Sequence, residues 1–323
     1  MASMTSRRRN LPGHDRTLRA KRTALGLVTA AIAGCTASSG PAPSPAGSST
    51  AERASSAVGG VAVGSESVTI AAAGDIARNP SHGVGTAALL EELQPGAVLA
   101  LGDLAYQNGS PSEFRENYDP TWGAFKAITR PIPGDHEYRT PEAAGYFAYF
   151  ESQIRGLDYY AWDAGTWRMY ALNCAVDCGR DSEQLSWLNQ DLQQHADRPA
   201  LAYVHEPLYS CSTRHPPLRR LDDIWSALDR AQGAILLSGN NHAYERFSLL
   251  DAKGRPSVTG VRQFVVGTGG VSLYPLSSPC PGREAGYDQS PGILRLDLTP
   301  DSYSWEFLSV DGQAVDSGVQ RLP

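Results

Sequence analysis

Short apolar runs that each end in Gly, Asp, Asn or His recur along the chain from about residue 67 onward. The runs are "SVTIAAAGDIA" (67–77), "AVLALGDLAY" (97–106), "RPALAYVHEP" (198–207), "GAILLSGNNHAYER" (233–246) and "VRQFVVGTGG" (261–270). Continuous apolar runs of this length, bounded by turn residues, are typical of buried strands.

Segments of helical period separate these runs. They are "VGTAALLEELQ" (84–94), "PSEFRENYDPTWGAFKAIT" (111–129), "DSEQLSWLNQDLQQH" (181–195) and "LRRLDDIWSALDRAQG" (218–233). The segment 181–195 opens with an Asp or Ser that can cap a helix, and its leucines follow a helical spacing. Alternation of strands and helices predicts an α/β fold.

Two segments depart from this alternation. Residues 159–173 read as a hairpin that turns near 163–165, and the C-terminal part from about 292 reads as a meander with turns at 299–302 and 311–312. Antiparallel strands beside the buried runs make the expected sheets mixed. We find no internal repeat and no boundary that would split 67–323, so this range is expected to be one domain.

The N-terminal part has the layout of an export signal. A basic start precedes a short apolar stretch at 24–33, and "IAGC" (32–35) resembles the lipobox of bacterial lipoproteins. We therefore expect residues 1–34 to be a lipoprotein-type signal peptide and Cys35 to carry the lipid. Twin-arginine export through Arg7–Arg9 and an ordinary cleaved signal are the alternatives. Residues 36–66 are rich in Ser, Ala, Gly and Pro, which predicts a flexible linker.

Charge limits the class of partner. The whole chain carries a formal charge of −6, and residues 1–34 hold seven Arg or Lys and one Asp, so the remainder carries −12. An acidic surface repels nucleic-acid backbones, and we expect no nucleic-acid partner. A small phosphorylated substrate is compatible with this charge if a metal ion supplies local positive charge. Contact with a membrane is expected only through the lipid anchor.

The four cysteines that follow Cys35 favour disulfides, because their number is even and the chain is expected to be exported. Cys174 and Cys178 lie close together in "CAVDC", and Cys211 and Cys280 both lie in loops rich in Pro and Ser. We favour the pairs Cys174–Cys178 and Cys211–Cys280 among the three pairings. A zinc site is less favoured, since no C-x2-C pair is present.

Polar side chains follow the expected strands at the edge where ligands bind in α/β sheets. They are Asp75, Asp103 with Tyr106, Asp135 with His136, His205, and Asn240 with His242. Each alone is most simply a turn residue, a helix cap or a structural histidine. Together they offer carboxylate, phenol, amide and imidazole ligands from separate segments, which suits two hard or borderline metal ions.

The series "GDIA", "GDLAY", "GDHE", "VHEP" and "GNNH" resembles the five blocks of the calcineurin-like metallophosphoesterases. The purple acid phosphatase-like branch, and within it actinobacterial extracellular proteins, is the most similar. The resemblance implies a sandwich of two mixed β-sheets flanked by helices, and hydrolysis of phosphoric esters by a metal-bound hydroxide at a two-metal site. Monoesters are the first choice of substrate and diesters the second.

The resemblance also implies roles for individual residues. Asp75, Tyr106 and His242 would bind the first metal, expected to be iron, and Asp103 would bridge both metals. Asp135, His205 and Asn240 would face the second metal, and His136 would act as general acid or phosphate contact. His215, in the loop "CSTRHPP", is a candidate substrate contact, and Glu206 either orients His205 or caps a turn.

This sequence departs from the family pattern at two positions of the second metal site. Asp135 stands where the family has Asn, and Asn240 stands where it has His. The resulting ligand set is harder and more anionic, and it favours Mn²⁺, Mg²⁺ or Ca²⁺ over Zn²⁺. The alternative is a pseudoenzyme or binding protein on the same fold, with one metal and little turnover.

Overall fold

Two mixed β-sheets form the centre of the computed structural model, which describes residues 67–215, 218–231 and 233–323. The first sheet has the order β13-β12-β11-β1-β2-β3. Its strands are β1 (Val68–Ala73), β2 (Ala97–Leu101), β3 (Thr129–Ile132), β11 (Gly292–Leu298), β12 (Ser302–Ser309) and β13 (Ala314–Arg321). β1, β2 and β3 run parallel, whereas β11, β12 and β13 form the expected antiparallel meander.

The second sheet has the order β10-β8-β9-β7-β6-β5-β4. Its strands are β4 (Tyr160–Ala164), β5 (Trp167–Ala171), β6 (Ala200–Tyr203), β7 (Ile235–Ser238), β8 (Tyr244–Phe247), β9 (Arg262–Val266) and β10 (Arg283–Tyr287). β4 and β5 are the expected hairpin, and β5, β6, β7 and β9 are parallel. The prediction of mixed sheets is confirmed.

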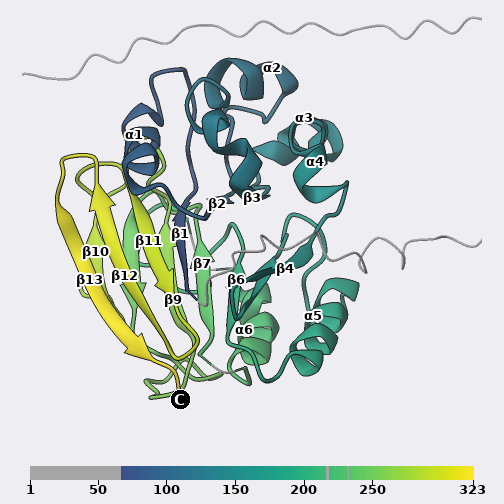
Figure 1. The fold of residues 1–323 in the computed structure, drawn as a ribbon, viewed down its shortest axis with the longest axis vertical. Coiled ribbons are helices and arrows are strands. Elements are labelled where there is room, and N and C mark those ends of the chain that lie inside the picture. Colours follow the sequence, from purple (N-terminus) through teal and green to yellow (C-terminus); the bar gives the residue numbers. More distant parts are fainter. Residues whose placement is uncertain (1–66, 216–217, 232) are drawn as a thin grey trace, which may run out of the picture. The chain divides into compact units, whose positions relative to one another are not determined.

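Helices cover the outer faces of the sheets (Figure 1). They are α1 (Val84–Leu93), α2 (Pro111–Glu113), α3 (Ala144–Tyr149), α4 (Glu151–Ile154), α5 (Glu183–Gln194) and α6 (Asp222–Leu228). One apolar core lies between the two sheets and continues beneath α1, and a second lies between the seven-stranded sheet and α5 with α6. Because β2 and β6 are buried along their whole length, they read as continuous apolar runs.

Two of the four helical segments, 84–94 and 181–195, end near their predicted boundaries as α1 and α5. The segment predicted over 218–233 ends early, with α6 at Leu228, and the segment 111–129 is broken. Ser182 caps α5 by accepting a hydrogen bond from the Leu185 N–H at 3.1 Å, as its sequence predicts. Residues 111–129 form α2, a π turn (Phe114–Tyr118) and a 3-10 helix (Trp122–Ile128) instead of one helix. Pro120 lies at the break, where it lacks the N–H that a continuous helix would use.

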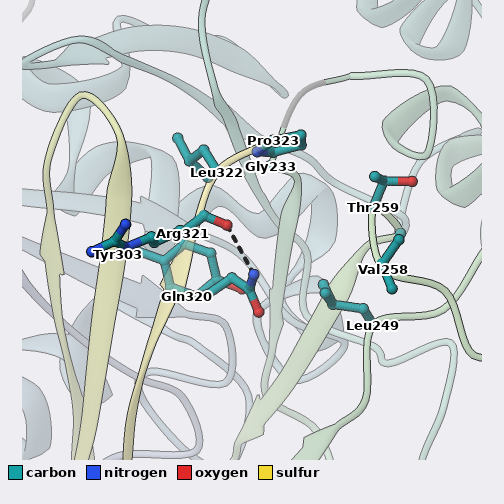
Figure 2. Close-up of a pocket in the computed structure, with 10 residues that line it drawn as sticks. Gly233, Leu249, Val258, Thr259, Tyr303, Gln320, Arg321, Leu322 and Pro323 are labelled. Carbon is teal, nitrogen blue, oxygen red and sulfur yellow. Dashed lines mark hydrogen bonds between the residues drawn. The ribbon is translucent and has the colours of Figure 1, made fainter.

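The C-terminal end packs at the base of the sheets. Leu322 occupies the space beside Gly233, where an added Cβ would lie 2.2 Å from its Cδ2. Figure 2 shows this end beside Leu249 and Val258, around a pocket of about 10 Å³. The predicted signal peptide, lipidated Cys35 and linker lie outside the described residues. The helices of the described part of the chain lack the length and apolar character that a bilayer-spanning segment needs.

Candidate metal centre

Tight turns at the carboxyl ends of the parallel strands bring the candidate residues to one edge of the molecule. Asp75, Asp103 and Asp135 follow β1, β2 and β3 of the first sheet. His205 follows β6, and Asn240 with His242 follows β7, in the second sheet. The group therefore lies across the ends of both sheets, as expected for a ligand site in an α/β fold.

Tyr106 is the centre of one group of contacts. Its hydroxyl donates to Oδ1 of Asp75 at 2.8 Å and lies 3.0 Å from Oδ2 of Asp103. Nε2 of His242 lies 3.2 Å from the same Asp75 oxygen and 3.4 Å from the Tyr106 hydroxyl. Tyr106 thus contacts the other three residues predicted around the first metal.

His205 joins the second group to the first. Its Nε2 lies 3.3 Å from Oδ1 of Asp103 and 3.7 Å from Oδ1 of Asp135. Nε2 of His136 lies 3.7 Å from Oδ2 of Asp103. Asp103 therefore contacts members of both groups, and this is the position that the resemblance gives to a bridging ligand.

Asn240 joins the cluster through its main chain. Its N–H donates to Oδ2 of Asp75 at 2.8 Å, and its φ of 63° is in the left-handed region. Asp75 and Asp103 share that unusual conformation, with φ of 61° and 54°. Non-glycine residues in this region are uncommon and concentrate at functional sites.

Main-chain carbonyls orient the two buried histidines. Nδ1 of His205 lies 2.8 Å from the Leu101 carbonyl, and Nδ1 of His242 lies 2.8 Å from the Ser272 carbonyl. Each carbonyl fixes a proton on Nδ1 and leaves Nε2 directed at the carboxylates, as in metal-binding histidines. The structure thus gives the orienting role considered for Glu206 to Leu101.

Glu137 is a buried residue of the site that the sequence interpretation missed. Its carboxylate accepts hydrogen bonds from the N–H groups of Asp103 (2.8 Å), Leu104 (2.9 Å), Ala105 (3.2 Å) and Gly134 (2.8 Å). It therefore ties the turn after β2 to the turn after β3. Burial, with the charge of Asp103, raises the pKa of Glu137 to about 8. The sequence feature that could have identified Glu137 is the acidic residue that ends the block "GDHE".

The charges of the cluster perturb each other strongly. Burial alone would lower the pKa of His205, but Asp103 and Asp135 raise it well above its usual value. Burial would raise the pKa of Asp75, but His242 holds it below its usual value. A hydrogen bond with His205 lowers the pKa of Asp135. Such opposed shifts are typical of sites where carboxylates gather around a cation.

His215 and Tyr274 lie beside the His242 ring. The Tyr274 ring stacks on the His242 ring, with centroids 4.1 Å apart and an interplanar angle of 10°. The His215 ring is 6.4 Å from His242 and 5.8 Å from Tyr274. The structure thus places His215 near the candidate centre. Tyr274 was missed, because its loop carries no metal-ligand pattern.

Comparison with known proteins supports this fold. No family model matches the chain. Purple acid phosphatase 21 of Arabidopsis thaliana is 28% identical over 199 residues, which are 53% of this chain and 43% of that protein. The purple acid phosphatase PPD1 from yellow lupin (Lupinus luteus) superposes with a TM-score of 0.60 at 18% identity, over 78% of this chain and 53% of that one. The fold is that of a calcineurin-like metallophosphoesterase.

This fold also occurs in a protein described by a different role. GAP50, the anchor in the inner membrane complex of Plasmodium, has a TM-score of 0.59 at 10% identity, over 80% of this chain and 89% of that one. The present chain spans less than half the length of the curated relative above, 43%. Proteins with this fold thus have different described roles, and the fold alone does not determine the activity of this chain.

The purple acid phosphatase-like fold implies a dinuclear metal centre, and the residues of this chain fit one. Ligand atoms of Asp75, Asp103 and His205 lie within 4.8 Å of one another, and so do those of Asp103, Asp135 and His136. Nε2 of His205 is buried and has no hydrogen-bond partner in the described part of the chain. A buried nitrogen without a hydrogen-bond partner, directed at carboxylates, fits a histidine that binds a metal ion.

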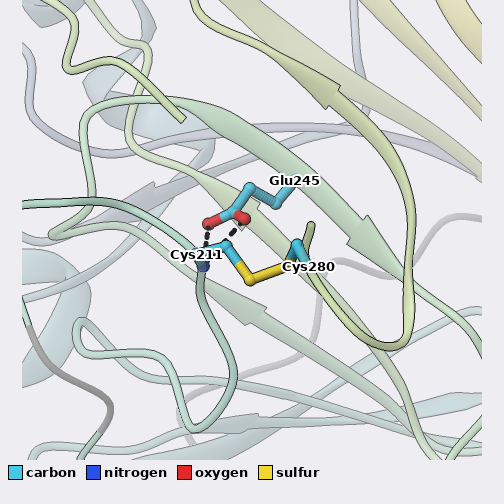
Figure 3. A group of neighbouring side chains, drawn as sticks. All are labelled: Cys211, Glu245 and Cys280. Carbon is cyan, nitrogen blue, oxygen red and sulfur yellow. Dashed lines mark hydrogen bonds between the residues drawn. A yellow bond between two sulfur atoms is a disulfide. The ribbon is translucent and has the colours of Figure 1, made fainter. Parts of the chain in front are cut away.

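Both predicted disulfides are confirmed, Cys174–Cys178 and Cys211–Cys280. Figure 3 shows the second beside the Glu245 carboxylate, which accepts hydrogen bonds from the Cys211 N–H at 3.0 and 3.2 Å. The Ser210 hydroxyl also donates to Glu245, and Arg283 pairs with it at 3.2 Å. We call these contacts the clasp. The clasp joins the loop of His215 to the loop of Tyr274, and its sulfurs, being bonded to each other, are not metal ligands.

Proposed function

We propose that the chain is a metal-dependent phosphoric ester hydrolase. Monoesters are the first choice of substrate class, and diesters are the second. The observation that carries this proposal is the convergence of two ligand groups on the shared carboxylate of Asp103. Two metals held in this way would neutralise phosphoryl charge and make water acidic enough to attack phosphorus. The purple acid phosphatase relatives support the same reaction class.

The donor atoms divide into two sets with different preferences. Asp75, Tyr106 and His242 would hold the first metal, proposed to be iron, with Asp103 shared. Asp135, His205 and Asn240 would face the second, for which the added carboxylate favours Mn²⁺, Mg²⁺ or Ca²⁺ over Zn²⁺.

His136 is the proposed general acid. Its Nδ1 lies 2.7 Å from the Gln107 carbonyl, which holds a proton on that nitrogen. When the ring is protonated, Nε2 also carries a proton, which it can donate to the oxygen of the leaving group. His215, whose ring lies 6.4 Å from that of His242, is the proposed contact for the phosphate oxygens.

Hydrolysis of p-nitrophenyl phosphate by the purified protein tests the proposal, with Mn²⁺, Fe and Zn²⁺ supplied in turn. We expect turnover that rises with Mn²⁺ and vanishes in Asp103→Asn, which also controls for a contaminating phosphatase. Absence of turnover with every metal, in a folded protein that binds one metal per chain, would sink the hydrolase.

The second candidate function is a binding protein on the same fold. The altered pair Asp135 and Asn240 favours it, because both changes fall on one metal site and Asp135 is half exposed. The fold of GAP50, described as an anchor, supports such a role in principle. Metal analysis separates the two: two metals per chain favour the hydrolase, and one favours the binding protein.

Export is part of the proposal. Two disulfides and the signal-like N-terminal sequence support an exported protein, anchored through Cys35. Radiolabelled palmitate should enter the wild-type protein and not the Cys35→Ser variant. Equal labelling of the two would contradict the anchor.

A further inference from the structure

Exposed arginines surround the candidate metal centre in a chain that is otherwise acidic. Arg78 follows the turn of Asp75, and its Cζ lies 5.2 Å from the centroid of the Tyr106 ring. The Tyr106 hydroxyl contacts Asp75 and Asp103. Arg78 is therefore separated from the carboxylate cluster by a single aromatic ring.

Arg214 lies over a different aromatic ring. Its Cζ lies 5.2 Å from the centroid of the Tyr274 ring, and that ring stacks on His242. A guanidinium held against an aromatic ring keeps its N–H groups free at the edge for a ligand. Two arginines from separate loops thus approach the cluster through the rings of Tyr106 and Tyr274.

The loop of Arg214 is tied down near this position. The Cys211–Cys280 disulfide and the hydrogen bonds of Glu245 join it to the loop of Tyr274. The Cys211 carbonyl also accepts from the Ser277 N–H at 2.9 Å. The disulfide and these hydrogen bonds therefore hold the loop of Arg214 against the loop of Tyr274.

The two aromatic rings meet at one residue. The ring centroids of Tyr274 and Tyr106 lie 4.1 and 6.4 Å from that of His242. Arg139 differs from Arg78 and Arg214, because it pairs with Asp135 at 3.4 Å. Arg78 and Arg214 are thus the two arginines that lie over rings beside His242.

We propose that Arg78 and Arg214 form a second anion site beside the metal centre, so that the preferred substrate carries a second phosphate on its leaving group. This inference rests on the proposed hydrolase function and names its substrate class as diphosphates. A planar guanidinium binds a phosphate through paired hydrogen bonds, and two of them match its charge. The whole chain has a net charge of −6, so its surface elsewhere would repel such an anion.

The reaction on this substrate balances without a co-reactant. Water attacks the terminal phosphorus, and the bond between that phosphorus and the bridging oxygen breaks with its electron pair. The bridging oxygen takes the proton of His136 Nε2, and the attacking water releases a proton to solvent. The products are inorganic phosphate and the shortened phosphate, which Arg78 and Arg214 hold during cleavage.

Kinetics with two substrates test the proposal. We would measure kcat/KM for ADP and for phenyl phosphate, whose leaving group is neutral, with the Mn²⁺-loaded protein. The ADP to phenyl phosphate ratio should fall about tenfold or more in Arg78→Gln and in Arg214→Gln, as for loss of a charge-assisted hydrogen bond. Arg255→Gln is the control, because Arg255 is also exposed but is held by an ion pair with Asp251 at 2.6 Å. An unchanged ratio in both Arg78→Gln and Arg214→Gln would overturn the anion site.

Binding separates this inference from the proposed function. If the wild-type protein hydrolyses neither the phenyl phosphate ester nor the ADP anhydride, the hydrolase fails, and calorimetry with pyrophosphate and inorganic phosphate still tests the arginines. Pyrophosphate should bind about tenfold tighter than phosphate, and Arg214→Gln should remove that advantage. Equal affinities for the two anions would contradict the second site whether or not the protein is an enzyme.

Discussion

At the scale of the residue, the candidate centre depends on small side chains beside its ligands. A Cβ added to Gly134 would lie 2.2 Å from Oδ1 of Asp103 and 2.6 Å from its main-chain nitrogen. A Cβ added to Gly239 would likewise lie 2.8 Å from Oδ2 of Asp75. Glycine at these places therefore sets the positions of the carboxylates.

Gly134→Ala should displace Asp103 and lower metal content and activity. We expect a loss of about 100-fold in kcat/KM, the size associated with a misplacement of about 1 Å. Gly179→Ala is the control, because its added Cβ would meet its nearest atom at an ordinary 3.5 Å. Full metal content and activity in Gly134→Ala would show that the turn adapts.

Glu137→Gln should weaken the connection between the turns of Asp103 and Asp135. The introduced NH₂ group would face main-chain N–H donors, so we expect a loss of about 1.5–3 kcal/mol in the free energy of unfolding. Urea unfolding measures it, with exposed Glu92→Gln as the control. Equal midpoints for the two variants would contradict the role of Glu137.

The sequence predicts the residues of the site that follow strands and not those that reach it from elsewhere. Asp75, Asp103 and His205 each end an apolar run, so period and position find them. Tyr274 enters from a loop after β9 that has no such pattern. The contact of Tyr274 with His242 depends on tertiary packing, which cannot be predicted from the local sequence.

At the scale of the element, an ion pair fastens α5 to the second sheet. Arg168 of β5 donates to both oxygens of Asp191 of α5, at 2.8 and 2.7 Å. Its Nη1 also donates to Asp163 of β4 at 2.9 Å. Burial would raise the pKa of Asp191, but Arg168 holds it below its usual value.

Asp191→Asn should lower stability by about 1.5–3 kcal/mol at pH 7, because it removes a charged acceptor from Arg168. The pKa of Asp191 is lower in the folded state, so its contribution is complete above the unfolded value of 3.8 and is lost as pH falls through the folded pKa. The stability difference between the two proteins should therefore be constant from pH 7 to about pH 4 and should narrow as pH falls below 3.8. A difference that stays constant well below pH 3.8 would mean that Asp191 acts through shape and not charge.

The two disulfides should differ in their effect on stability. Cys211 and Cys280 are 69 residues apart, whereas Cys174 and Cys178 are 4 apart, so the first removes more freedom from the unfolded chain. The double variant Cys211→Ser, Cys280→Ser should lose about 2–4 kcal/mol. The pair Cys174→Ser, Cys178→Ser is the matched control in calorimetry, and an equal loss in both would contradict the loop-length account.

The sequence predicted helices and strands with a clear hydrophobic pattern, but it did not reveal two short strands at the sheet edges. β3 and β10 each form one of the two edges of their sheet. β3 contains Pro131, which an edge strand tolerates, and β10 alternates between half-buried and exposed residues without an apolar run. Their strand conformation comes from pairing with a neighbour, so the isolated sequence gives little signal.

At the scale of the whole molecule, metal binding should stabilise the fold, because the ligands come from both sheets. We expect Mn²⁺ at about 100 times its Kd to add about 2.7 kcal/mol. Thermal melts with Mn²⁺ and with a chelator measure the effect, and Asp103→Asn should reduce it. Identical melting temperatures with and without Mn²⁺ would argue against a metal centre that links the sheets.

The division of the site between two sheets also has a consequence for the order of events during folding. Asp75 and His242 meet only when strands from distant parts of the chain have reached their final places. A half-folded chain therefore offers a cation only fragments of its coordination shell. Tight binding of the metal ion would therefore be a late step, which occurs only when the two sheets have reached their final arrangement.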